Sequence, residues 1–245
     1  MSKQLDTTKF HRQLGIVDPD KLFALKVRII GVGGIGSAVA LILAKVGVGS
    51  IEVFDPDIIE EANLPNQFYR NTDVGSPKVE ALARLVADFS ETAEVIPHFE
   101  AYDPTQNYAG SPDVVICAVD SMEFRKELWL KVKNKFKPFL YIETRMGGED
   151  FRVYALSPLM SSLHGVYENT LYTSKQAEQI ACTEKAIMYN VMMVASLVGS
   201  FIKMYVSEGV EGIPFEVLGN ILNTMFLTTS AKDGALRTIR KEAGV

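Results

Sequence analysis

A glycine-rich stretch between two apolar runs constrains the fold of this chain more than any other feature. In order, its residues are Val27–Ile30, Gly31, Gly33, Gly34, Gly36, an apolar segment in helical period to Val46, Ile51–Phe54 and Asp55. The spacing predicts a strand, a glycine turn, a helix, a second strand and an acid. Glycines let backbone N–H groups approach a phosphate at a helix N-terminus, and a strand-end acid can bind a ribose hydroxyl. We therefore predict a nucleotide site, while the glycines also suit tight packing of a helix on a strand.

The composition and the charge limit the classes of partner. Of 245 residues, 47% are hydrophobic and 22% are charged, as in an ordinary soluble globular protein. The net charge is -5, with acids and bases interspersed, which argues against a nucleic-acid partner. Cys117 and Cys182 are too few and too far apart for a disulfide framework or a four-cysteine zinc site. Because the polar N-terminus also lacks the apolar core of a signal peptide, we expect a cytoplasmic protein.

The apolar stretch Ala186–Val206 is long enough to raise the question of a membrane span. Asn190 and Lys203 interrupt it, and small residues recur at i and i+4, which suits close packing against another helix. These small residues are Ala195, Ser196, Gly199 and Ser200. We expect a buried helix, with a dimer interface as one location for it, rather than a span, and we expect no membrane partner.

The rest of the chain alternates between helix and strand patterns. Pro77 opens a predicted helix over Lys78–Phe89, whose apolar residues share one face. The run Asp113–Val119 is typical of a central parallel strand, and Asp120 stands at its carboxyl end, where ligand groups gather in open α/β sheets. Further strands are expected at Ala93–Phe99, Phe139–Glu143, Phe151–Leu156 and Phe215–Leu227, and a further helix at Ser121–Phe136.

These elements predict a single α/β domain over residues 1–245. Its core, residues 26–156, is a Rossmann-like doubly wound, mostly parallel sheet. A helical arm precedes the core over residues 1–25, a crossover loop occupies residues 157–183, and a C-terminal helix with strands follows over 184–245. A connection as long as this loop is usually functional or mobile. We expect Ala231–Val245 to form a charged tail.

Six motifs stand in order between Phe10 and Asp120. They are F-x-R-Q at Phe10–Gln13, G-x-G-G-x-G at Gly31–Gly36, D-x-D at Asp55–Asp57, N-L-x-x-Q at Asn63–Gln67, V-G-x-P-K at Val74–Lys78, and Asp120 after its strand. Together they resemble the superfamily of ubiquitin-like-protein activating enzymes, which includes the bacterial adenylyltransferases MoeB and ThiF, and the resemblance runs from about Phe10 to about Leu227. Six ordered motifs are much more specific than one glycine loop.

The resemblance implies an adenylation reaction with ATP and Mg²⁺. In that family the C-terminal glycine carboxylate of a small ubiquitin-like β-grasp protein or peptide attacks the α-phosphate, giving an acyl-adenylate and pyrophosphate. Carried over, Gly34 would lie against the nucleotide and Asp55 would hold the ribose. Lys78 would offset phosphate charge, and Asp120 would hold Mg²⁺. Arg12 would reach across a homodimer into the ATP site of the second copy. The nucleotide-binding set that the resemblance implies is Gly31, Gly33, Gly34, Gly36, Asp55, Asp57, Asn63, Asn66, Gln67, Lys78, Asp120 and Ser121.

The sequence also departs from the family pattern. Asn66 stands where the family usually carries arginine, which leaves the site short of one phosphate-binding cation, and Arg70 is the candidate substitute. Ser121 replaces the common asparagine after Asp120 and can still hydrogen-bond. The two C-x-x-C pairs that bind zinc in many members are absent, so we expect no zinc. Cys182 lies near the place where relatives carry a cysteine that can accept the activated acyl group.

Each candidate residue has an alternative role. Asp55 could be a solvated acid at a strand end, and Lys78 could be an exposed residue of a first helical turn, although a cation there opposes the helix dipole. Asp120 could cap the helix that follows it, and Arg12 could be an ordinary surface residue. Cys182 has no histidine nearby in sequence to lower its pKa and could be an inert thiol. The three histidines form no ligand or triad pattern.

Two rival functions stay open beside adenylation. An NAD-dependent oxidoreductase would use the same glycine fingerprint and Asp55, but it would leave Lys78 and Asp120 without a role, and no hydride-transfer arrangement stands out. A catalytically inactive binding scaffold of the activating-enzyme type would account for Asn66. The expected function is that of an ATP- and Mg²⁺-dependent adenylyltransferase.

Overall fold

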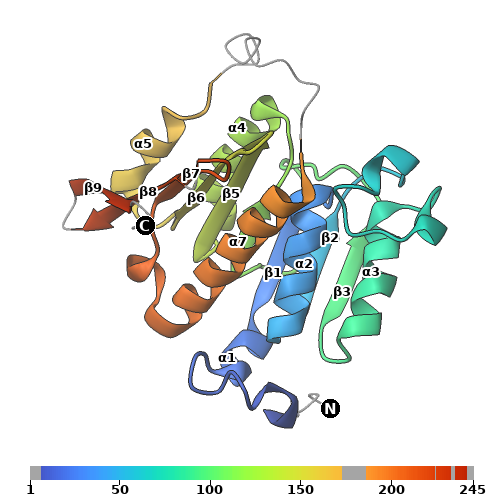
Figure 1. Ribbon diagram of the computed structural model, residues 1–245. Helices are drawn as coiled ribbons and strands as arrows, with labels where there is room; N and C mark the ends of the chain where they lie inside the picture. Colours follow the sequence, from blue (N-terminus) through green and yellow to red (C-terminus); the bar gives the residue numbers. More distant parts are fainter. Residues whose placement is uncertain (1–6, 173–185, 224, 233–234, 242–245) are drawn as a thin grey trace.

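A nine-stranded sheet organises the computed structural model, which describes residues 7–172, 186–223, 225–232 and 235–241 (Figure 1). The strand order is β3-β2-β1-β4-β5-β6-β7-β8-β9. The parallel strands are β1 (Lys26–Ile30), β2 (Ser50–Phe54), β3 (Glu94–His98), β4 (Val114–Cys117) and β5 (Leu140–Gly147). The antiparallel extension consists of β6 (Asp150–Leu156), β7 (Glu216–Asn220), β8 (Met225–Lys232) and β9 (Ala235–Lys241). The predicted Rossmann-like α/β class is confirmed, with five of the nine strands parallel.

Helices cover both faces of this sheet. One face packs against α2 (Gly34–Val46), α3 (Lys78–Phe89) and α7 (Met188–Glu208), and the other against α4 (Met122–Lys131) and α5 (His164–Glu168). The helix α1 (Pro19–Ala24) leads directly into the amino end of β1 (Figure 1). Short helical turns are Thr7–Phe10, Glu61–Asn63, Asn71–Asp73, Val132–Phe136, Ser161–Leu163 and Val210–Gly212.

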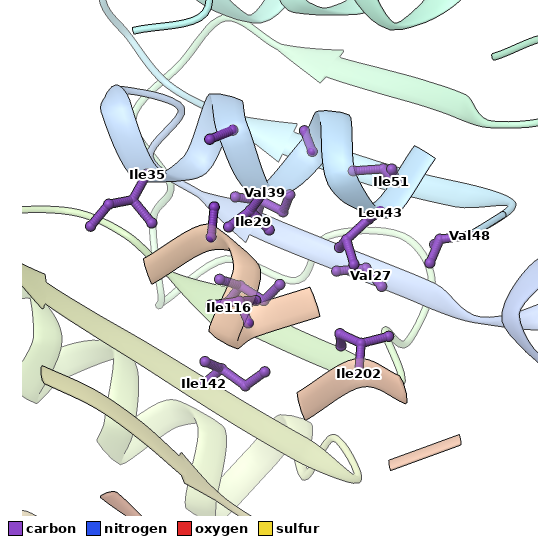
Figure 2. Close-up of a cluster of buried hydrophobic side chains, with 14 of the residues drawn as sticks. Val27, Ile29, Ile35, Val39, Leu43, Val48, Ile51, Ile116, Ile142 and Ile202 are labelled. Carbon is purple, nitrogen blue, oxygen red and sulfur yellow. The ribbon is translucent and has the colours of Figure 1, made fainter. Parts of the chain in front are cut away.

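The larger core lies between the sheet and the helices α2 and α7. Figure 2 shows Val27, Ile29, Ile116 and Ile142, from three adjacent strands, packed with Val39 and Leu43 of α2 and Ile202 of α7. Successive strand residues point to opposite faces, so the alternate residues Ile30, Val115 and Tyr141 belong to the second core, under α4 and α5. Burial on both faces accounts for the continuous apolar runs of these strands.

The helix α7 has one buried and one exposed face. Its buried residues recur every three or four positions, and it contacts α2, β5 and β6. A Cβ on Gly199 would lie 2.9 Å from Ile42 of α2, which confirms the predicted close packing of helices. Among the described residues, α7 is the one helix long and apolar enough to cross a membrane by length and composition. Tyr189, Met192 and Ser196 lie on the exposed face, so burial is less complete than the sequence predicts.

The C-terminal segment differs from the prediction. In place of a charged tail from Ala231 onward, β8 continues to Lys232 and pairs with β9 in antiparallel orientation. Charge along a segment does not prevent a strand when a neighbouring strand supplies hydrogen-bond partners for its backbone. The segment predicted as a loop from residue 157 likewise contains a helical turn and α5 in its described part.

Candidate functional site

A cavity of about 730 Å³ lies at the carboxyl ends of β1, β2 and β4 and beside β5. Its walls bring together residues that are far apart in the sequence, as expected at this edge of a parallel sheet. The predicted site residues that line it are Gly31, Gly33, Gly34, Asp55, Asp57, Asn63, Asn66, Gln67, Lys78, Asp120 and Ser121. Gly36 lies just behind this lining, in the first turn of α2.

The glycines serve both chain packing and access to the helix terminus. Gly31 has φ +87°, and a Cβ on Gly36 would lie 1.9 Å from the main-chain oxygen of Gly31, so no larger side chain fits there. By contrast, a Cβ on Gly33 would meet nothing closer than 3.9 Å. Among the described residues, no side chain caps the N-terminus of α2 at Gly33. The first N–H groups of a helix lack intrahelical partners, so this terminus suits an anion in the cavity.

Asp55 is buried and oriented by the backbone. Its Oδ2 accepts a hydrogen bond from the N–H of Val32 at 2.8 Å, and its Oδ1 accepts one from the N–H of Asp57 at 2.9 Å. Burial raises the pKa of Asp55 above its ordinary value, although these two hydrogen bonds oppose the shift. Tyr69 also donates to the carbonyl of Val32, at 2.6 Å. Asp55 is therefore not a solvated strand-end acid, because it ties the glycine turn to the end of β2.

Lys78 is buried at the start of α3, so the alternative of an exposed residue in the first turn is wrong. Its Nζ donates to Oδ2 of Asp57 at 2.8 Å, and its backbone N–H donates to the carbonyl of Asp57. The side chain of Asp57 is 61% exposed, whereas that of Lys78 is 7% exposed. A buried ammonium in the wall of a cavity is placed to attract an anionic ligand.

Two amide side chains in the cavity wall have unused acceptors. Oδ1 of Asn66 and Oε1 of Gln67 are buried, and neither has a hydrogen-bond partner among the described residues. The neighbouring Asn63 differs, because its Oδ1 accepts a hydrogen bond from the N–H of Glu60 at 3.0 Å. Buried polar atoms are nearly always paired in folded proteins, so the two orphan oxygens indicate a ligand or ordered water in the cavity.

Asp120 is exposed at the cavity rim, between β4 and α4. The N-cap of α4 is Ser121, whose Oγ accepts a hydrogen bond from the N–H of Phe124 at 3.2 Å. The alternative of Asp120 as the helix cap is therefore wrong, and its carboxylate has no partner within the described part of the chain. That part contains no cluster of three or more metal-ligating side chains. A Mg²⁺ ion bound with nucleotide phosphates needs only one or two carboxylates, so Asp120 and Asp57 fit that role.

Besides Gly36, the described residues Arg70 and Arg12 were predicted for the site and do not line the cavity. Arg70 follows the loop that carries Asn66, but its guanidinium forms an exposed ion pair with Asp88 of α3. Cys182 lies outside the described residues. Arg12 is exposed on the N-terminal arm, beyond the far end of α2. The thirteen residues of α2 put about 20 Å between that end and the glycine turn.

The motif around Arg12 has a clear local role. Phe10 packs against Gly47 at the C-terminal end of α2, where a Cβ would lie 3.0 Å from its ring. Nε2 of Gln13 donates to the carbonyl of Val46 at 2.6 Å. The flanking residues thus anchor the arm on the domain and leave Arg12 exposed between them.

Other lining residues were not predicted from the sequence. Tyr102 follows β3, Thr144 and Met146 lie on β5, and Arg125 lies on α4. The N–H of Arg125 donates to the carbonyl of Ser121, so Arg125 is one helical turn beyond the N-cap and faces the same side. That four-residue spacing from Ser121 was a usable signal for Arg125.

The fold defines a domain of the doubly wound α/β class, with a cavity at the carboxyl ends of its parallel strands. Within that class the chain belongs to the ThiF family, whose model matches residues 5–242. The family resemblance inferred from the six motifs is confirmed.

Similar proteins agree with this membership. The Nedd8-activating enzyme E1 catalytic subunit of Drosophila melanogaster is 38% identical over 103 residues, which are 41% of this chain and 23% of that protein. The SAMP-activating enzyme E1 of Haloferax volcanii is 35% identical over 129 residues, which are 50% of this chain and 47% of that protein. The match thus spans less than half of each curated relative. The crystal structure of E. coli MccB with AMPCPP and MccA shares the fold, with a TM-score of 0.68 and 19% identity over 98% of this chain and 72% of that chain.

Proposed function

We propose that this chain binds ATP and Mg²⁺ in the cavity and adenylates the C-terminal carboxylate of a small ubiquitin-like protein or peptide. One observation carries the proposal. A single cavity holds buried Lys78, the uncapped N-terminus of α2, and three groups that have no partner among the described residues, namely Asp120 and the two amide oxygens. The two curated relatives named above are activating enzymes, which supports the same class of reaction.

The order of the strands suggests how the substrates lie. Asp55 follows β2, the glycine turn follows β1, Asp120 follows β4, and Thr144 lies on β5. The sheet order β2-β1-β4-β5 and a strand spacing of about 4.8 Å put about 14 Å between the two ends of this row. The ribose would lie at the Asp55 end, the α-phosphate over the glycine turn, and the acceptor carboxylate would enter past Thr144.

The reaction forms one bond and breaks one. A carboxylate oxygen attacks the α-phosphorus, and the bond from that phosphorus to the bridging oxygen breaks, so pyrophosphate leaves with the electron pair. The N-terminus of α2 and Lys78 offset the negative charge that develops on the phosphates. Mg²⁺, held by Asp120 and Asp57, would supply further positive charge on the phosphate oxygens.

The charge of the cavity supports a need for cations from outside this chain. Its lining carries the carboxylates of Asp55, Asp57 and Asp120 against the cations Lys78 and Arg125, a formal charge of −1. A nucleotide triphosphate adds more negative charge, so Lys78 and Arg125 are too few to balance it. In our proposal Mg²⁺ and the exposed Arg12 of a second copy supply the difference, and the active form is a homodimer.

A thermal-shift titration with ATP plus Mg²⁺, ATP plus EDTA, and NAD tests the nucleotide. A ligand at about a hundred times its dissociation constant adds roughly 2.7 kcal/mol to the free energy of unfolding. We expect stabilisation by ATP that grows with Mg²⁺, whereas stabilisation by NAD alone would favour an oxidoreductase.

Exchange of labelled pyrophosphate into ATP tests the chemistry. We expect exchange with peptides that end in a free glycine carboxylate and none with the same peptides amidated at that carboxylate. Asp120→Ala should abolish exchange and keep the fold, because Asp120 is exposed and has no partner in the described chain.

A catalytically inactive scaffold is the second candidate. It is favoured by Asn66 at the usual arginine position and by the ion pair that holds Arg70 away from the cavity. ATP binding without exchange for any peptide would support it.

A further inference from the structure

A buried ionic cluster stands directly behind the cavity. Its centre is Glu143 of β5, which is fully buried on the face of the sheet covered by α4 and α5. Arg125, Arg145 and Tyr167 all donate hydrogen bonds to its carboxylate. We name these four residues the Glu143 cluster.

Glu143 is ionised within this cluster. Burial acts to raise its pKa, but the charge of Arg125, together with the hydrogen bonds and charge of Arg145, lowers the pKa overall. A buried carboxylate with two guanidinium partners fixes the geometry of both arginines, because each would otherwise be an unpaired buried charge.

The two arginines differ in what else they bind. Nη2 of Arg125 donates to the carbonyl of Val119, the residue before Asp120, and Arg125 lines the cavity. Arg145 does not line the cavity; its Nη1 and Nη2 donate to the carbonyl and the Oγ1 of Thr170, at 2.8 and 3.0 Å. One guanidinium therefore faces the rim that carries Asp120, and the other faces the end of α5.

Asp120 depends on its neighbours for its position. Before it, the N–H of Ala118 donates to the carbonyl of Ile30 at 2.9 Å, and the carbonyl of Val119 accepts from Arg125. After it, Ser121 caps α4. Arg125 thus supplies the side-chain contact that fixes the peptide unit entering Asp120.

We propose that Arg125, held in place by Glu143, is a positioning residue that sets the Asp120 carboxylate for the metal ion bound with the nucleotide. This inference rests on the proposed function and deepens it. In this role Arg125 acts on Asp120 through the main chain, by way of the carbonyl of Val119. Partners outside the metal's own ligands commonly change metal affinity by about tenfold or more when they are lost.

A matched pair of variants separates positioning from a purely structural role. Lysine at either arginine position keeps the charge next to Glu143, but it cannot bridge two acceptors in the way a planar guanidinium does. Arg125→Lys loses the link between Glu143 and Val119, whereas Arg145→Lys loses the link between Glu143 and Thr170. If the cluster only joins β5 to its helices, the two variants should behave alike.

The experiment measures metal binding directly, with Mn²⁺ as the probe and electron paramagnetic resonance as the readout. Each full-length variant is titrated with Mn²⁺ at saturating ATP, and ATP binding in EDTA is measured separately. We expect Arg125→Lys to raise the Mn²⁺ dissociation constant about tenfold and Arg145→Lys to leave it within about twofold. ATP binding in EDTA should be unchanged in both variants.

Several outcomes overturn the inference. They are a wild-type Mn²⁺ dissociation constant in Arg125→Lys, an equal rise of that constant in both lysine variants, and a loss of ATP binding in EDTA that accompanies the rise. If Arg125→Lys does not fold, Glu143→Gln is the second variant to test. It should raise the Mn²⁺ dissociation constant about tenfold. A wild-type value would again overturn the inference. A wild-type protein that binds no Mn²⁺ with ATP would instead refute the proposed function, so the two failures are distinguishable.

Discussion

Lys78→Met separates the stability of the fold from phosphate binding. At 2.8 Å and an effective dielectric constant of about 20, the ion pair with Asp57 would have a Coulomb energy of about 6 kcal/mol. Water reduces this greatly, because 61% of the Asp57 side chain is exposed, and pairs of this kind contribute about 0.2 to 1 kcal/mol. The variant should therefore lower the free energy of unfolding by less than about 1 kcal/mol.

The effect of Lys78→Met on catalysis should be much larger. Removing one donor that stabilises developing negative charge costs about 3 kcal/mol in the transition state, which is roughly a hundredfold in rate. Pyrophosphate exchange measures this loss, and urea titration measures stability. Lys203→Met is the control, since Lys203 forms an ion pair with Glu208 at 3.8 Å on α7, away from the cavity. Exchange at the wild-type rate in Lys78→Met would refute the assignment of Lys78 to the phosphates.

Further predictions test the glycine turn, Arg70 and two buried groups. Gly36→Ala places a Cβ 1.9 Å from a main-chain oxygen and should lower the free energy of unfolding by about 3 kcal/mol. Gly33→Ala meets no close neighbour and should leave stability unchanged. It should weaken ATP binding about tenfold, as measured by calorimetry. Arg70→Ala breaks only an exposed ion pair, so the ATP affinity should be unchanged; a weaker affinity would restore Arg70 as the substitute cation. Burial raises the pKa of Cys117 to about 11, so alkylation at pH 8, read by mass spectrometry, should label Cys117 only after unfolding. Burial also raises the folded-state pKa of Asp55 above 3.8. The contribution of Asp55 to the free energy of unfolding should therefore fall as the pH rises from 3.8 through that raised pKa. Urea titrations of wild type and Asp55→Asn at several pH values measure this contribution as a difference.

The parts of the fold that local patterns determine were predictable from the sequence. The unit from β1 to β2 could be predicted from the glycine spacing and the apolar runs. Asp120 lies at the same edge of the sheet as the carboxyl ends of β1 and β2, because parallel strands end at one edge. Asn66 and Gln67 lie on a loop that follows β2, so their motif could be assigned to the cavity from the sequence.

Features that depend on distant partners were not predictable in the same way. The strand β9 forms against β8, and nothing in its own charge pattern indicates that pairing. Arg70 is four residues from Asn66 in sequence, but the turn Asn71–Asp73 and the ion pair with Asp88 direct it away from the cavity. In the sequence, Glu143 is the last residue of a predicted apolar strand. Only the packing of α4 and α5 on that strand shows that its carboxylate is buried among hydrogen-bond donors.

The two cations that line the cavity share one property that bears on how the site works. Lys78 is paired with Asp57, and Arg125 is paired with Glu143, so neither offers an uncompensated charge to a ligand. The Asp57 pair is partly exposed and can exchange its partner for a phosphate, whereas the Glu143 pair is buried and cannot do so without leaving a buried charge unpaired. In the proposed function, nucleotide binding would therefore release Asp57 as Lys78 turns to the phosphates. Asp57, which shares the cavity lining with Asp120, would then be free to hold the metal in the proposed reaction, so metal binding would depend on nucleotide binding.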